Sequence, residues 1–153
     1  MDHKACIDAL NDLVKINNDR IAGYQKAIEE LNDEENKDLK SLFARMITES
    51  KACKEELKQM IHSYGGDSES GTTASGKLYR AWMDVKAFFG GGDRATVLKN
   101  CEAGEDAAQK AYQTALEDDS VMAQTKVLIR KQKEQLRHSH DEIKQLRDAA
   151  VAH

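Results

Sequence analysis

Four long segments of this 153-residue chain repeat apolar residues at spacings of three and four, and the whole sequence contains no proline. This spacing is the period of an α-helix that buries one face. Proline would interrupt such a helix, so its absence permits helices of many turns. Only 5% of the residues are aromatic and 33% are charged, which is typical of long helices rather than of a sheet. The sequence therefore predicts an all-α protein.

The periodic segments predict four long helices joined by two short turns and one long connection. We expect the long helices at residues 2–31, 35–64, 94–117 and 120–150. A few polar residues separate the first two and the last two, so each pair forms an antiparallel hairpin. The long connection holds a shorter amphipathic helix at 75–89, with Trp82 on its apolar face. Because this connection can run the length of the bundle, we expect a ferritin-like four-helix bundle with one crossover, built as a single domain over residues 1–153.

Charge and hydropathy argue against several classes of function. The formal net charge is −4 and the basic residues do not gather in one block, which argues against nucleic-acid binding. No segment approaches about 18 consecutive apolar residues, and the N-terminus lacks the apolar run of a signal peptide. We therefore expect a cytoplasmic protein without membrane contact. Cys6, Cys53 and Cys101 lie far apart on apolar stripes, and we interpret them as buried, reduced thiols.

Each long helix carries one polar residue in the middle of its apolar stripe. In chain order these residues are Asn17, Glu49, Glu105 and Gln132. Folding each hairpin about its turn places Asn17 level with Glu49, and Glu105 level with Gln132. Four separate interruptions of the pattern thus converge on one level of the bundle. The sequence predicts an internal polar layer there.

Buried carboxylates have to be neutralised by a proton, by hydrogen bonds or by a cation, and this leaves two interpretations of the layer. In the first, Asn17 and Gln132 donate hydrogen bonds to Glu49 and Glu105, and the layer fixes the register of the helices. In the second, the carboxylates hold iron or another divalent metal ion. Glu102, one turn before Glu105, would then turn inward as a third ligand.

His140 is a further candidate metal ligand, because it lies on the flank of the apolar face of the last helix. A lone histidine in such a place is more often a satisfied boundary residue than a ligand. The ligand set of an iron-oxidising bundle is also incomplete. Such a bundle uses two Glu-x-x-His motifs. Here the residue three positions after Glu49 is Ala52, and the residue three positions after Gln132 is Gln135. We therefore predict no catalytic residue and no required cofactor.

Several stretches resemble a known bacterial family of chains of this length. They are LNDLVKINNDRIAGYQKA, GKLYRAWMDVKAFF, CEAGEDAAQKAYQTAL and HDEIKQLRDA. The third stretch is the most specific of them. The family is classed as a domain of unknown function within the ferritin-like superfamily. The resemblance implies a ferritin-like bundle in a bacterial cytoplasmic protein, and it implies no activity.

Two classes of function remain open, with a weaker third. In the first, the protein is a non-enzymatic, stress-associated bundle that acts by binding a partner or a second copy, and Trp82 and Phe89 form the contact between subunits. In the second, it binds a metal ion through core carboxylates, with iron redox chemistry. The third is a pocket for an unknown small molecule, edged by Tyr24, Tyr112 and His140.

Overall fold

The computed structural model describes residues 3–31, 34–68 and 93–151, and every regular element in these ranges is a helix. The helices are α1 (Lys4–Glu30), α2 (Lys37–Ser63), α4 (Arg94–Glu117) and α5 (Ala123–Val151). The bounds of α4 are those expected, and the other three helices begin or end one to three residues from the expected positions. The helix expected at 75–89, with Trp82 and Phe89, lies outside the described residues.

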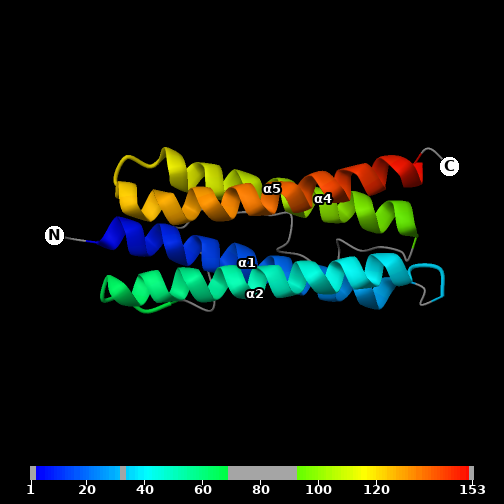
Figure 1. Cartoon of the computed structure of the whole chain (residues 1–153), viewed down its shortest axis with the longest axis horizontal. Coiled ribbons are helices and arrows are strands. Elements are labelled where there is room, and N and C mark those ends of the chain that lie inside the picture. Colours follow the sequence, from blue (N-terminus) through cyan, green and yellow to red (C-terminus); the bar gives the residue numbers. More distant parts are fainter. Residues whose placement is uncertain (1–2, 32–33, 69–92, 152–153) are drawn as a thin grey trace.

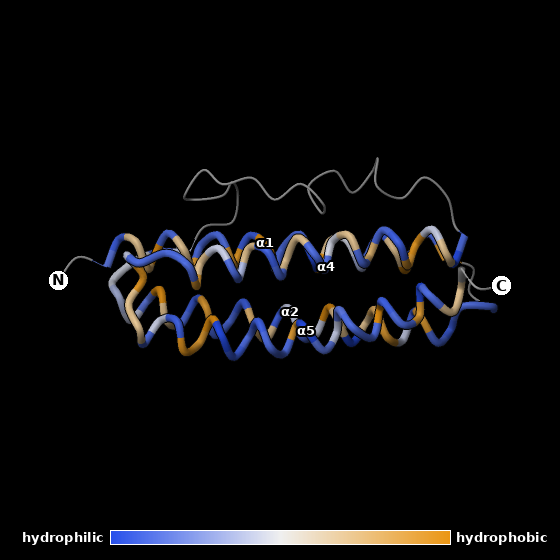
Figure 2. Tube along the Cα trace, turned by 90° about the horizontal axis from the view of Figure 1, so that it is seen from above, coloured by the Kyte–Doolittle hydropathy of each residue, from blue (hydrophilic) through white to orange (hydrophobic). Residues whose placement is uncertain are grey.

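The four helices form two antiparallel hairpins, α1 with α2 and α4 with α5 (Figure 1). Seen after a quarter turn about the long axis, the bundle has two layers, with α1 and α4 in one layer and α2 and α5 in the other (Figure 2). Of these two cross-hairpin contacts, α1 with α4 is the more extensive. α2 ends and α4 begins at opposite ends of the bundle. The predicted all-α bundle of two hairpins is confirmed.

The core consists of two apolar clusters on either side of a polar middle. One cluster is centred on Leu10, Leu13, Leu57 and Leu136, and the other on aromatic and aliphatic residues that include Tyr24 and Phe43. Along the helices, five buried polar side chains lie between the two clusters, namely Asn17, Arg20, Ser50, Glu105 and Ser139. Each helix therefore has to bring a polar residue to the middle of its own apolar face.

Local signals at the helix ends explain where the elements stop and start. Asp93 caps α4, because its side chain accepts a hydrogen bond from the backbone N–H of Thr96 at 3.2 Å. After α2, Gly65 takes a φ of 80°, a left-handed conformation that glycine adopts without strain. The chain then packs closely on α1, since a Cβ at Gly66 would lie 2.8 Å from Cδ1 of Ile7.

Two further expectations from the sequence bear on compartment and redox chemistry. Cys6, Cys53 and Cys101 are all buried and free of disulfides. Burial raises the pKa of the Cys53 thiol to about 12, so this thiol stays protonated and unreactive at neutral pH. Among the described helices, none combines the length and the hydropathy that crossing a membrane requires.

We expect the substitution Leu136→Ala to lower the free energy of unfolding by about 2–5 kcal/mol, because it empties a fully buried position. The Leu136 side chain is 0% exposed and belongs to the larger apolar cluster. Urea denaturation followed by far-ultraviolet circular dichroism measures the loss. The control is Val127→Ala on the same helix. Val127 is 63% exposed, so its truncation should change the stability by less than about 0.5 kcal/mol. Equal losses in the two variants would contradict the described packing.

Candidate functional site

A buried arginine occupies the middle of the polar layer. The Arg20 side chain is 0% exposed, and its Nε donates a hydrogen bond to Oε1 of Glu105 at 2.6 Å. Its Nη1 donates to Oγ of Ser50 at 2.8 Å, and its Nη2 lies 3.0 Å from Oε1 of Glu49. The guanidinium thus places a positive charge between a carboxylate of α2 and a carboxylate of α4.

Two hydroxyl groups complete this cluster. Tyr24 donates from its Oη to Oε1 of Glu105 at 2.7 Å, and Ser139 on α5 donates to Oε1 of Glu49 at 2.8 Å. Burial has the largest single effect and lowers the pKa of Arg20, but the charge and hydrogen bond of Glu105, together with Tyr24 and Glu49, outweigh it and raise the pKa above its ordinary value. Arg20 therefore stays charged, and all four helices contribute a side chain to its surroundings.

The two amides of the predicted layer belong to a separate group of hydrogen bonds. Asn17 donates from Nδ2 to Oη of Tyr112 at 2.9 Å, and this hydroxyl donates in turn to Oε1 of Gln132 at 2.7 Å. Gln132 donates onward to Oε1 of Glu56, on the exposed side of α2, at 3.0 Å. The amides are thus linked to each other through a tyrosine.

The structure places all four residues of the predicted layer in or beside the core, but with other partners. Asn17 and Gln132 are not the donors to Glu49 and Glu105, since Arg20 takes that role. Arg20 is missing from the predicted set because the apolar stripe of α1 is continued through Ile21, one residue later. Both positions fit helical spacing. The structure distinguishes the two, because it shows that the side chain of Arg20 is fully buried in the core.

Arg20 also decides what the core carboxylates can do chemically. A metal ion at Glu49 and Glu105 would have to displace a guanidinium that both carboxylates already contact. Leaving both cations in place would bring like charges together in a medium of low dielectric constant. Moving Arg20 out would break several buried hydrogen bonds at once. Glu49 and Glu105 are therefore partners of Arg20 and are poorly suited to bind a metal ion.

A second cluster of candidate ligands lies at the edge of the α4–α5 contact. Glu102 and His140, both predicted ligands, meet Asp106 there, and one ligand atom from each of the three lies within 4.8 Å of the others. His140 holds its Nε2 at 2.5 Å from Oδ1 of Asp106 and its Nδ1 at 3.2 Å from Oδ1 of Asp141. Arg147 contacts Oε2 of Glu102 through Nη1. Glu49 and Glu105 remain with Arg20, so the four predicted ligands divide between two places.

Helix geometry explains how this outer cluster forms. Glu102 and Asp106 are four residues apart on α4 and so lie on one face of it, toward α5. Asp106 is not among the predicted ligands, although its spacing from Glu102 is a signal for it. The side chain of Asp106 is 61% exposed, whereas Glu102 and His140 are largely covered, so the cluster opens to solvent beside Asp106.

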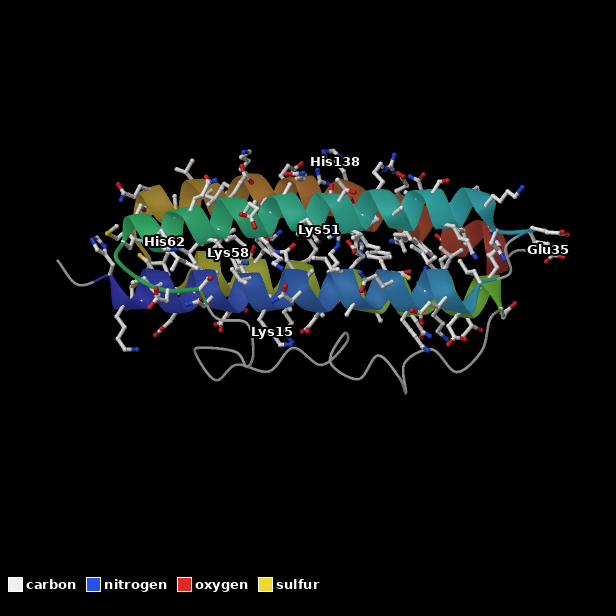
Figure 3. The ribbon with its side chains drawn as sticks, turned by 90° about the horizontal axis from the view of Figure 1, so that it is seen from below. Lys15, Glu35, Lys51, Lys58, His62 and His138 are labelled. Atoms are coloured by element: carbon white, nitrogen blue, oxygen red, sulfur yellow. The ribbon has the colours of Figure 1, made fainter. Side chains whose placement is uncertain are left out.

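The protonation of His140 follows from its two acidic neighbours. Partial burial lowers the pKa of the imidazole, but hydrogen bonds to Asp141 and Asp106 and the charges of nearby carboxylates outweigh burial. The net effect raises the pKa above its ordinary value of 6.5. His138 lies outside this cluster: Figure 3 shows it on the outer surface of the bundle, and its side chain is mostly exposed.

Two clefts flank the C-terminal part of α5, and Leu146 lines both. The larger, of about 630 Å³, lies between α2 and α5 and includes Leu39 and the contacting pair Arg45 and Glu142. The smaller, of about 380 Å³, lies beside the start of α4. Tyr24 and Tyr112, expected at the edge of a pocket, do not line either cleft. Both are fully buried, with their hydroxyl groups in hydrogen bonds.

The core ion pair generates a prediction about stability. Arg20→Met should lower the free energy of unfolding by about 3–5 kcal/mol, because it leaves the Glu105 carboxylate buried without its cation. The double variant Arg20→Met with Glu105→Gln removes that stranded charge and should recover part of the loss. Urea denaturation of the three proteins gives the comparison. A double variant less stable than Arg20→Met alone would show that the pair is not the source of the cost.

His140 generates a prediction about pH. A histidine whose pKa is higher in the folded protein than in the unfolded chain contributes stability below its unfolded value of about 6.5 and loses this contribution as the pH rises through its folded value. The difference in unfolding free energy between the natural protein and His140→Gln should therefore be larger at pH 5.5 than at pH 9. Denaturation at several pH values measures it, and His138→Gln serves as the control because it removes an exposed histidine of the same helix that lies outside the cluster.

Comparison with known proteins gives one family. A family model described as "Domain of unknown function (DUF2383)" matches residues 5–118, which takes in nearly all of α1 and the whole of α2 and α4, and the search of curated proteins returned no match. Glu102 and Asp106 lie within the matched range, whereas His140 and Arg147 follow it. Membership of the ferritin-like superfamily stays a prediction. Since the match covers well over half of the chain, this protein belongs to the DUF2383 family.

Proposed function

We propose that this protein is a non-enzymatic helical bundle that binds a divalent transition-metal ion through Glu102, Asp106 and His140. The observation that carries the proposal is the convergence of three ligand atoms within 4.8 Å, from two helices that pack against each other. Ligand atoms around one such ion lie about 3–3.5 Å apart, given metal–ligand distances near 2.1 Å.

The ligand types indicate which ions are suitable. Imidazole favours zinc, iron, nickel and copper, whereas carboxylate oxygen also suits manganese. One imidazole with two carboxylates therefore fits Zn²⁺, Mn²⁺ or Fe²⁺. Binding without turnover would suit the sequestration of such an ion, for example in a response to metal or oxidative stress. The surroundings of Arg20 favour this outer site over the core carboxylates Glu49 and Glu105, both of which the arginine already contacts.

The outer cluster holds exchangeable positive charge. Glu102 contacts Arg147, which is 28% exposed, and Asp106 with Asp141 favours the binding of a proton to His140 by raising the pKa of the imidazole. A metal ion has to replace both, because only the neutral imidazole nitrogen can serve as a ligand. We therefore expect an affinity that is moderate and that falls with decreasing pH.

Isothermal titration calorimetry with Zn²⁺ tests the proposal on the full chain. The natural protein should bind about one ion at pH 7.5, and the dissociation constant should rise at least tenfold at pH 6, where protons occupy His140. His140→Ala should weaken binding at least tenfold. His138→Ala is the matched control, because this exposed histidine lies on the same helix and outside the cluster.

Two results would count against the proposal. The first is that no ion binds at pH 7.5 to a protein that has kept its helical circular dichroism spectrum. The second is that both histidine variants weaken binding equally, which would indicate adventitious binding at the surface. Glu105→Gln separates the core from the outer site, because it should leave the affinity for Zn²⁺ within about threefold if only the outer residues are ligands.

A further inference from the structure

We infer that the larger cleft, between α2 and α5, binds an uncharged, largely apolar small molecule that carries a hydrogen-bonding group such as a hydroxyl or a carbonyl. The volume of the cleft is about 630 Å³. Binding sites for small molecules are mostly apolar cavities of about 300–1,000 Å³, in which a few polar groups orient the ligand. The cleft shares no residue with the proposed metal site, so this inference does not depend on metal binding.

The first support is the apolar floor of the cleft. α2 and α5 form one layer of the bundle (Figure 2), and their contact is the least extensive of the four between neighbouring described helices. Leucines of both helices line the space between them. Leu39 is fully buried, whereas Leu42 and Leu146 are partly exposed. An apolar ligand that covers Leu42 and Leu146 removes their surface from water, and this favours binding.

The second support is the shape of the cleft, which favours a small molecule over a helix of a partner protein. On α2 the cleft extends from Asp38 to Arg45, about 10 Å at 1.5 Å per residue. Arg45 donates from Nη2 to Oε2 of Glu142 at 2.8 Å, so this ion pair bridges α2 and α5 at one end of the cleft. The bridge would obstruct a helix that lay along the groove. A small molecule fits between the bridge and the start of α2.

The third support is the state of the charged residues in the described lining, each of which already has a partner of opposite charge. Arg45 contacts Glu142, and Asp38 accepts hydrogen bonds from Arg94 at 2.8 and 3.1 Å. A charged ligand would lose water in an apolar cleft and find no unpaired charge of opposite sign in this lining. An uncharged ligand avoids this cost.

The fourth support is a pair of neutral polar side chains on the two walls of the cleft. Ser41 of α2 and Gln145 of α5 line it, and neither side chain has a hydrogen-bond partner within residues 3–31, 34–68 and 93–151. A hydroxyl and a carboxamide can each donate and accept a hydrogen bond. They therefore suit a hydroxyl or a carbonyl on a ligand whose apolar part rests on the leucines.

A fluorescent probe and three matched competitors test the inference on the full chain. Nile red is an uncharged dye whose fluorescence rises in apolar surroundings, and it should bind the folded protein saturably. The competitors are 1-octanol, octanoate and octylammonium, which share an apolar chain and differ in charge. At pH 7.5 the dissociation constant of 1-octanol, measured by displacement of the dye, should be at least fivefold lower than that of either ion.

Substitutions in the cleft locate the binding. Leu42→Gln and Leu146→Gln change partly exposed positions, so both variants should keep the helical circular dichroism spectrum, whereas the dissociation constant of Nile red should rise at least fivefold. Val127→Gln is the matched control, because Val127 is an exposed apolar residue of α5 outside the cleft, and it should change this constant less than twofold.

The double variant Ser41→Ala with Gln145→Met removes both neutral polar groups and keeps similar side-chain sizes. It should raise the dissociation constant of 1-octanol at least threefold, because the hydroxyl of the ligand loses its hydrogen-bond partners. An unchanged constant would overturn the role of Ser41 and Gln145.

Four other results would overturn the inference. They are the absence of saturable Nile red binding to folded protein, stronger displacement by octanoate or octylammonium than by 1-octanol, and equal losses in Leu146→Gln and Val127→Gln. The fourth is a dimer, detected by light scattering, that Leu146→Gln dissociates, since a second copy of the chain would then occupy the cleft.

Discussion

The ion pair between Arg20 and Glu105 is the interaction on which the arrangement of the bundle depends. It joins α1 to α4, and therefore one hairpin to the other, at the level where the two apolar clusters meet. Glu49 extends it to α2, and Ser139 extends it to α5. Removing two charges from water costs much of what their attraction returns, so the pair adds little net stability. Its contribution is specific, because a shift in register would strand a buried charge.

Much of the fold was predictable from the sequence because its signals are local. The period of the apolar stripes and the short polar turns indicate the helices and the hairpins, and Asp93 marks the first turn of α4. Asn17, Glu49, Glu105 and Gln132 also stand out, since each interrupts its own stripe. Their partners were less accessible, because pairing depends on how neighbouring helices are rotated about their axes. Arg20 and Ile21 fit the stripe of α1 equally well, and the meeting of Asp106 with His140 depends on the rotation of α5 against α4.

Adjacent residues of α4 serve two different environments. Successive residues of a helix are about 100° apart around its axis, so Glu105 points into the core while Asp106 points to its edge. The inner carboxylate is matched by an arginine that solvent does not reach. The outer ones are in contact with His140 and with Arg147, which is partly exposed. A bound cation can leave only if water takes its place. Because Arg20 is buried, the positive charge beside Glu105 is fixed, whereas the positive charge at the partly exposed outer cluster can be replaced.

This division has a consequence for how binding and folding are coupled. A metal ion at the outer cluster would connect α4 only to α5, whereas the surroundings of Arg20 involve all four helices. Any ligand that binds only the folded chain stabilises it in proportion to the logarithm of its concentration over its dissociation constant. A metal ion at the outer cluster would stabilise the packing of α4 on α5, whereas the contact between the two hairpins would still depend on the polar layer around Arg20. An ion at the proposed site on the outer face of α4 would therefore bind and leave while Glu105, on the inner face, keeps the register of the bundle.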